Sequence, residues 1–259
     1  DELFETIGGC GLFQVFAYFA IAIGMSAPSW FIYEIGYFTQ APDAYICTYT
    51  GAPQPDICTK ENICAGDERI ASWEADPDSA KTLYNWQQKL DLTCVDDWKI
   101  GMIGASQGIG WCVTLLWLPA IADKNGRKNL FWFGMTCDLL LYTGLMITDS
   151  LGVMIALYFC FGMLCSIRTQ VGYVYLMEML PKKAQSYVTS GWNVQEAMIY
   201  VIGTIYFWKI SKHWFWYCLV GYIWQVISVV FLFWMPESPR YLVSVGKLYE
   251  ARKAFSTIA

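Results

Sequence analysis

Charged side chains are scarce in this chain of 259 residues: they make up 15% of it, whereas a soluble domain carries about 25%. Too few charges remain to cover a surface that faces water on all sides. The sequence also contains no Walker phosphate loop, no nucleophile elbow and no histidine cluster with metal-ligand spacing. Its single histidine, His213, stands at a predicted helix boundary, where we expect a structural role. We therefore predict that the protein is not an enzyme, with no catalytic residues, no metal and no cofactor.

Apolar residues are abundant, at 56%, and they fall in long blocks separated by short charged stretches. A helix needs about 20 apolar residues to cross a bilayer, whereas a barrel strand needs only about 10 that alternate with polar ones. Six blocks meet the helix requirement, and none shows strand alternation. They comprise residues 11–32, 100–122, 129–147, 151–179, 188–208 and 214–235. The predicted fold is an all-α membrane protein with six transmembrane helices.

The distribution of basic residues predicts the orientation of these helices, because cytoplasmic loops are enriched in Lys and Arg. Three connections that alternation places on one side carry most of them. These residues are Lys124, Arg127, Lys128, Lys182, Lys183, Arg240, Lys247, Arg252 and Lys253. Lys209 and Lys212 lie on the opposite side and oppose the rule weakly. We expect the side with the larger number to be cytoplasmic.

The long connection between the first two helices then lies outside the cell or in a lumen. It carries eleven acidic residues against four basic ones. A solvated surface explains this charge, and an acidic entrance that concentrates cations is the second interpretation. The same segment holds Cys47, Cys58, Cys64 and Cys94, which suggests two disulfides with three possible connectivities. No Asn-x-Ser/Thr sequence occurs in the chain, so we expect no N-linked glycan.

These features divide the chain into four segments. Residues 1–38 hold the N-terminus and the first helix, and residues 39–98 form the outer loop domain. Residues 99–235 hold helices two to six, and residues 236–259 begin a cytoplasmic helical linker.

Four stretches resemble motifs of the organic cation and anion transporters, a solute carrier family of the major facilitator superfamily. They are Gly-Leu-Phe-Gln at 11–14, Asn-Trp-Gln through Leu-Asp-Leu-Thr-Cys and Trp at 85–98, Ala-Asp-Lys-Asn-Gly-Arg-Lys at 122–128, and Met-Pro-Glu-Ser-Pro-Arg-Tyr-Leu at 235–242. The large loop after the first helix is also a trait of this family. The resemblance spans nearly the whole chain, and the last motif is quite specific.

This resemblance implies the N-terminal half of a twelve-helix transporter, with six helices arranged as two inverted three-helix repeats. Solute would bind near the membrane midplane between two such halves, which rock around it. The second half is then supplied by further chain or by another subunit. We expect a small organic ion as substrate, the lipid bilayer as surroundings and no nucleic acid as partner. The plasma membrane is the expected location, and an organelle membrane stays open.

The resemblance also implies a conformational switch at the cytoplasmic surface. Its predicted members are Asp123, Gly126, Arg127, Lys128, Glu178, Glu237 and Arg240. Glycine permits a tight turn at 126, and the two prolines at 236 and 239 stop the sixth helix. An ordinary basic turn and a plain helix stop are the alternatives. Lys124 departs from the arginine usual in the family, which removes a bidentate partner.

Ionisable and aromatic groups inside the bilayer indicate the substrate cavity. The candidates are Trp30, Arg168, Tyr173, Gln195 and Glu196. Arg168 and Glu196 could instead pair with each other, and any single aromatic could belong to the interfacial belt. Asp138 is expected to be a hydrogen-bond partner between helices. Arg168 favours an anionic substrate, whereas the acidic loop and the aromatic residues favour a cation.

One departure from the family suggests a second hypothesis. Tyr158 stands where the family has an arginine early in the fourth helix. Together with Lys124 and the missing second half, it fits a transporter-derived structural subunit of a larger membrane complex that no longer transports. The first hypothesis remains a secondary-active or facilitative transporter of small organic ions that works by alternating access.

Overall fold

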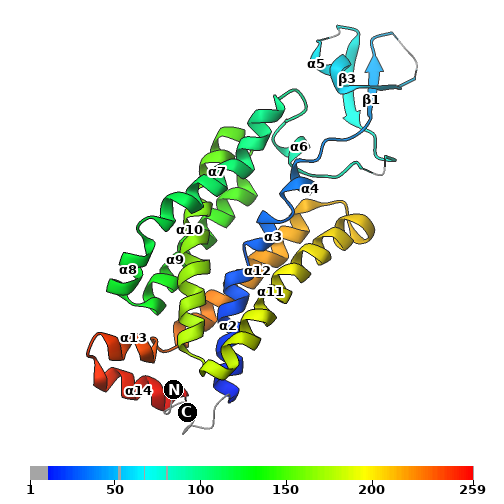
Figure 1. Ribbon diagram of the computed structural model, residues 1–259. Helices are drawn as coiled ribbons and strands as arrows, with labels where there is room; N and C mark the ends of the chain where they lie inside the picture. The colour runs from blue at the N-terminus through cyan, green and yellow to red at the C-terminus, as the bar shows by residue number, and fades with distance from the viewer. Residues whose placement is uncertain (1–10, 52–53, 67, 80, 259) are drawn as a thin grey trace.

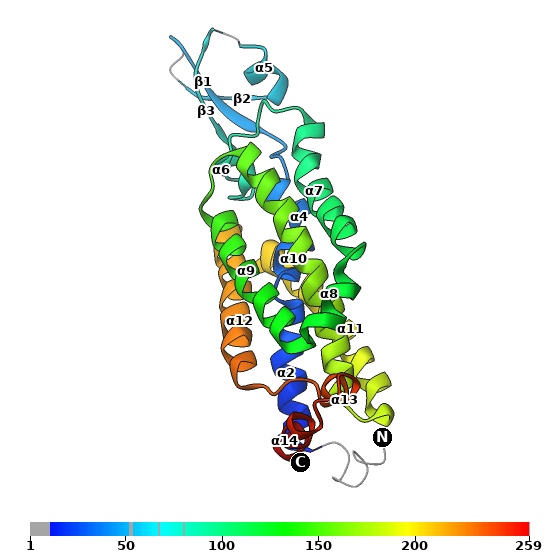
Figure 2. The same ribbon diagram turned by 90° about the vertical axis from the view of Figure 1, so that its left-hand side faces the viewer.

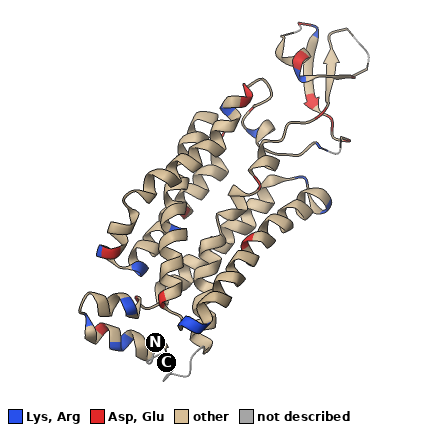
Figure 3. Ribbon diagram, in the orientation of Figure 1, with Lys and Arg blue, Asp and Glu red and all other residues tan. Residues whose placement is uncertain are grey.

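A computed structural model describes residues 11–51, 54–66, 68–79 and 81–258. The molecule is an elongated bundle of helices with a small sheet beyond one end and two short helices at the other (Figure 1). We call the end near the sheet the loop end and the opposite end the basic end. Charged residues concentrate towards these two ends, and few lie between them (Figure 3). The first ten residues of the predicted N-terminal segment lie outside the described part.

The first transmembrane segment is broken into three helices, α2 (Leu12–Ser26), α3 (Ser29–Ile32) and α4 (Ile35–Thr39). Together they form an apolar span of 28 residues. The second segment consists of α7 (Asp97–Leu115) and α8 (Leu118–Asn125), which are bent by 56°. Pro119 explains this break, because it has no N–H to donate and its ring collides with the carbonyl four residues earlier, that of Leu115.

The remaining segments are α9 (Arg127–Ile147), α10 (Leu151–Glu178), α11 (Lys182–Ile205) with the π-helical turn η1 (Tyr206–Ile210), and α12 (Trp214–Trp234). In the described chain, four segments are long and apolar enough to cross a membrane, and the bent pair makes a fifth if it is one span. The predicted block at residues 188–208 corresponds to α11, which has the length but carries polar residues such as Asn193, Gln195 and Glu196. Two short helices follow, α13 (Pro239–Ser244) and α14 (Leu248–Ile258).

Helix α10 lies at the centre of one side of the bundle, where it packs on α7 and α9 (Figure 2). Its contact with α7 is a crossing of small residues. A Cβ atom added at Gly162 would lie 2.0 Å from the carbonyl oxygen of Gln107, and one at Gly110 would lie 2.1 Å from that of Phe159. Glycine therefore allows the two backbones to touch, as small residues commonly do between membrane helices. On the other side, α12 packs on α2 and α9.

The loop domain contains an antiparallel sheet of three strands that the sequence analysis did not predict. Its order is β2 (Asp56–Cys58), β1 (Tyr45–Tyr49), β3 (Ile70–Ala75), and the short helices α5 (Lys60–Cys64) and α6 (Trp86–Lys89) complete the domain. Both predicted disulfides are present. Cys47 pairs with Cys58, and Cys64 pairs with Cys94.

Loss of the Cys64–Cys94 disulfide should loosen the loop domain more than loss of the Cys47–Cys58 disulfide. The two bridges join residues 30 and 11 positions apart, and chain entropy alone predicts stabilisations of about 4 and about 3 kcal/mol. Limited trypsin digestion at Lys60 and Arg69 measures this effect on paired cysteine-to-serine variants. Serine at the exposed free cysteines Cys112 and Cys160 is the control. Equal cleavage of all variants would contradict the expectation.

Candidate functional site

A groove of about 520 Å³ opens between the first segment and the helices α10 and α11. Its volume is that of a site for a small molecule. The residues that line it come from α3, α7, α10 and α11 and from the turn after α3. They are Ser29, Ile32, Tyr33, Trp111, Arg168, Thr169, Gln170, Tyr173, Thr189, Trp192, Asn193 and Glu196.

Glu196 is held in this groove by two neutral hydroxyl groups. Its Oε2 accepts a hydrogen bond of 2.6 Å from Ser29 Oγ and one of 2.9 Å from Tyr33 Oη. Its Oε1 is buried and has no hydrogen-bond partner among the described residues. Tyr173 stands nearby, with its hydroxyl 3.2 Å from Thr189 Oγ1 and its ring 5.9 Å from that of Trp192. The groove therefore combines a carboxylate with aromatic rings.

Arg168 forms its ion pair with Asp138 of α9, not with Glu196. The Nη1 of Arg168 lies 3.4 Å from Asp138 Oδ2, and the two side chains are 1% and 0% exposed. Gln225 of α12 donates to the same Asp138 oxygen at 2.9 Å and to the Met135 carbonyl at 3.1 Å. Asp138 is thus a hydrogen-bond acceptor between helices, as expected, and the positive charge of Arg168 is already paired.

The structure places Trp30 and Gln195 elsewhere than in the groove. Trp30 is 7% exposed and packs on Tyr217 and Trp224 of α12, with ring centroids 4.8 and 6.5 Å away. Gln195 donates to Ser26 Oγ at 2.9 Å and so connects α11 to α2. Ser29, which precedes Trp30, and Glu196, which follows Gln195 and was itself predicted, line the groove. Neighbouring residues face different ways because a helix turns by about 100° per residue.

Sequence reasoning missed Glu34, which lies between α3 and α4 and is fully buried. Neither of its carboxylate oxygens has a hydrogen-bond partner in the described chain. It lies against Gly203 of α11, where an added Cβ would come within 2.1 Å of Glu34 Oε1. The prediction ended the first helix at residue 32, whereas the apolar run from Ile35 to Phe38 was the signal that the helical segment continues.

At the basic end, the predicted switch residues lie together and form what we call the basic-end cluster: Asp123, Gly126, Arg127, Lys128, Glu178, Glu237 and Arg240. Arg127 is its centre. Its Nη2 lies 2.8 Å from Asp123 Oδ1, its Nε lies 3.4 Å from Glu178 Oε1, and its guanidinium group stands 4.9 Å from the Tyr241 ring. One arginine thus connects the end of α8, the end of α10 and the start of α13.

Glu237 connects the same cluster to the start of α9. Its Oε1 accepts hydrogen bonds of 2.9 Å from the backbone N–H groups of Lys128 and Ser238, at a helix N-terminus where a negative charge is stabilised. Gly126 makes this approach possible. Its φ is +89°, and a Cβ there would lie 2.6 Å from Glu237 Oε2. Arg240 donates to the Leu180 carbonyl at 3.3 Å and so contacts the turn between α10 and α11.

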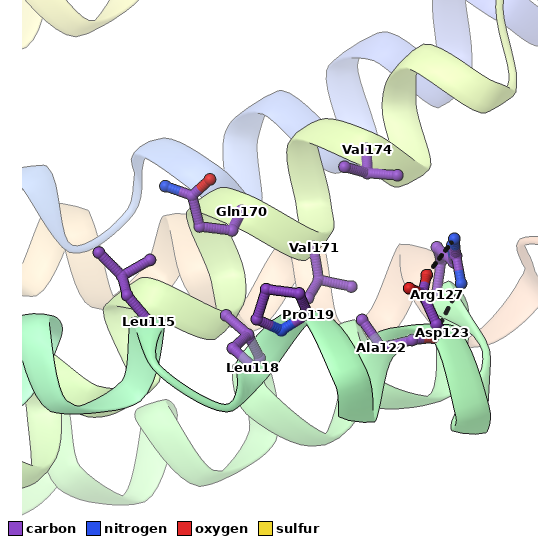
Figure 4. Close-up of a pocket in the computed structure, with 9 residues that line it drawn as sticks. All are labelled: Leu115, Leu118, Pro119, Ala122, Asp123, Arg127, Gln170, Val171 and Val174. Atoms are coloured by element: carbon purple, nitrogen blue, oxygen red, sulfur yellow. Dashed lines mark hydrogen bonds and ion pairs between the residues drawn. The ribbon is translucent and has the colours of Figure 1, made fainter.

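A second hollow of about 240 Å³ adjoins this cluster inside the bend between α7 and α8 (Figure 4). Apolar side chains from both helices and from α10 line it, including Leu115, Leu118 and Val174. The ion pair of Asp123 with Arg127 stands at one end of it in the same view. The bend and the charged cluster are therefore neighbours.

A family model described as "Sugar (and other) transporter" matches residues 18–259. The chain belongs to this family of membrane transporters. Among its curated relatives, solute carrier family 22 member 16 of Xenopus laevis is 22% identical over 306 residues, which cover 100% of this chain and 54% of the relative. Organic cation transporter 1 of Caenorhabditis elegans is 22% identical over 293 residues, or 100% of this chain and 49% of the relative. Sugar transporter ESL1 of Arabidopsis thaliana is 27% identical over 162 residues, or 61% and 33%.

These matches confirm the predicted resemblance to solute carriers of the major facilitator superfamily. The chain is an integral membrane protein of a transporter family. It spans about half the length of the first two relatives named above.

Proposed function

We propose that this chain forms one wall of an alternating-access transporter for small organic cations, with the groove around Glu196 as its part of the substrate site. A second six-helix half would supply the opposite wall, from further chain or from another subunit. The basic end would face the cytoplasm, the segment 39–98 would lie outside, and the plasma membrane would be the location.

The charge balance of the groove carries this proposal. Arg168 and Asp138 neutralise each other, whereas Glu196 is held only by hydroxyl groups. The groove is therefore left with one negative charge in surroundings of low dielectric constant, where a cation is attracted and an anion is repelled. The rings of Tyr173, Trp192 and Trp111 add cation–π attraction.

The basic-end cluster supports the alternating-access part. Its ion pairs and hydrogen bonds join the ends of four helices. Asp123 is exposed, and Arg127 and Glu178 are not fully buried, so these contacts can break when the halves rock apart. The adjacent bend at Pro119 provides a place where α7 and α8 can change their angle.

Glu196→Gln should lower the uptake of tetraethylammonium by the intact protein in proteoliposomes by at least about tenfold. An ion pair in partly buried surroundings contributes a few kcal/mol, and 1.4 kcal/mol is already a factor of about ten. Glu250→Gln, on the exposed surface of α14, is the matched control and should leave uptake unchanged. Equal uptake by the Glu196 variant and the unmodified protein would contradict the assignment of the site. A protein that carries only organic anions would overturn the substrate class.

A further inference from the structure

A third hollow, of about 510 Å³, lies in the loop domain between the sheet and α6. Its size again suits a small molecule. The residues around it come from β1, from β3 and the turn after it, and from α6 with its flanking turns. It is separate from the groove at Glu196, with which it shares no residue.

Three aromatic side chains stand around this hollow. Trp73 and Tyr45 pack edge to face across β3 and β1, with ring centroids 5.7 Å apart. Tyr84 stacks on His213 at 5.0 Å. Trp73 and Tyr84 remain 37% and 45% exposed, so part of each ring is available to a ligand. Tyr45 is 2% exposed, and its buried hydroxyl has no hydrogen-bond partner among the residues described.

Two carboxylates, those of Glu74 and Asp91, line the same hollow. Within the part of the chain that the structure describes, neither forms an ion pair. The lysine nearest to Glu74 in sequence, Lys81, pairs with Asp43 at 3.0 Å. The lysine nearest to Asp91, Lys89, is directed to the bundle instead. It donates to the Met146 carbonyl at 2.7 Å and lies 4.8 Å from the Trp214 ring, and burial lowers its pKa. The hollow therefore carries uncompensated negative charge beside aromatic rings.

The floor of the hollow is fixed to the transmembrane bundle. Gln87 donates to the Thr39 carbonyl at 2.7 Å, and Asn85 donates to those of Tyr37 and Gln40 at 2.8 Å. Thr93 is followed by Cys94, which the second disulfide joins to Cys64. Because its walls are braced in this way, the hollow is preformed and little ordering is needed when a ligand enters.

We propose that this hollow is a separate binding site for a small ammonium ion with a hydroxyl or N–H donor, a choline-like cation. The two carboxylates would attract its charge, Trp73 and Tyr84 would contact it through their ring faces, and the buried Tyr45 hydroxyl would accept its donor. If the hollow serves as an outer docking site for the transported cation, that role rests on the proposed function. The binding itself stands on the loop domain alone.

Choline binding to the intact protein in lipid nanodiscs tests this inference, with radiolabelled choline as probe. The measurement is made in a Glu196→Gln background, so that the groove does not contribute. Adding Glu74→Gln and Asp91→Asn should weaken the remaining binding by at least about tenfold. Trp73→Leu should weaken it about fivefold while Trp73→Phe retains most of it, because only the latter keeps a ring. The neutral isostere 3,3-dimethylbutan-1-ol should not compete.

Asp56→Asn with Glu61→Gln is the matched control, since it removes two exposed loop carboxylates that do not line the hollow. Undiminished binding in the Glu74 and Asp91 variant would overturn the site. An equal loss in the control pair would also overturn it, because the effect would then come from the general acidity of the loop. Failure of the proposed function is seen separately, as unchanged tetraethylammonium uptake in Glu196→Gln alone.

Discussion

Arg168→Ala is expected to lower the free energy of unfolding by about 3–5 kcal/mol, although no step of the proposed transport cycle requires this arginine to touch substrate. The reason is the carboxylate that it leaves behind. Asp138 is fully buried and would retain only the hydrogen bond from Gln225. A single buried charge without a counterion is among the most costly groups that a membrane helix bundle can contain.

A double substitution separates this cost from any role in binding. Arg168→Met with Asp138→Leu replaces the ion pair by apolar side chains of similar length and should recover most of the lost stability. Thermal unfolding in detergent, followed by tryptophan fluorescence, measures both variants. If the double variant is stable and still carries tetraethylammonium, the pair is structural. A stable double variant that has lost cation uptake would show that Arg168 takes part in recognition. An Arg168→Ala protein as stable as the unmodified one would contradict the burial argument itself.

The sequence predicted the membrane segments because a bilayer imposes length and composition on each of them separately. The breaks inside the segments were harder. Pro119 could have indicated the bend between α7 and α8, whereas the continuation of the first segment to Thr39 depends on packing around the buried Glu34. The sheet was missed because β1 pairs with β3 across more than twenty residues, and neither strand alternates clearly between polar and apolar residues.

For the sites, too, local features could be predicted from the sequence, whereas features that depend on packing could not. The residues of the basic-end cluster belong to local motifs at neighbouring helix ends, so their association could be predicted. The groove could be predicted only in part. Helices that are apolar nearly all round give no sign of which face is interior, so Trp30 was chosen where its neighbour Ser29 lines the groove. The partner of Arg168 depends on how α9 and α10 are rotated, and the sequence fixes that rotation only through packing.

Glycines of α7 offer the sharpest test of that packing. Gly110→Ala should destabilise the bundle by about 3 kcal/mol, because its new methyl group would lie 2.1 Å from a backbone carbonyl of α10 and would push the two helices apart. Gly108, two residues earlier on the same helix, has nothing within 4 Å of the corresponding position. Gly108→Ala should therefore stabilise the helix by about 0.5–1 kcal/mol through its lower backbone entropy when unfolded.

The two variants differ from the unmodified protein by the same methyl group, so any difference between them reports the helix contact alone. Thermal unfolding of both in the same detergent measures it, and Gly162→Ala on the facing helix should behave as Gly110→Ala does. Equal unfolding temperatures for the Gly108 and Gly110 variants would mean that α7 and α10 do not touch at this crossing. The groove would then lose the contact that holds Trp111 in its lining, since Trp111 follows Gly110 on α7 and the position of α7 depends on the close approach of Gly110 and Gly162 to the opposite backbone.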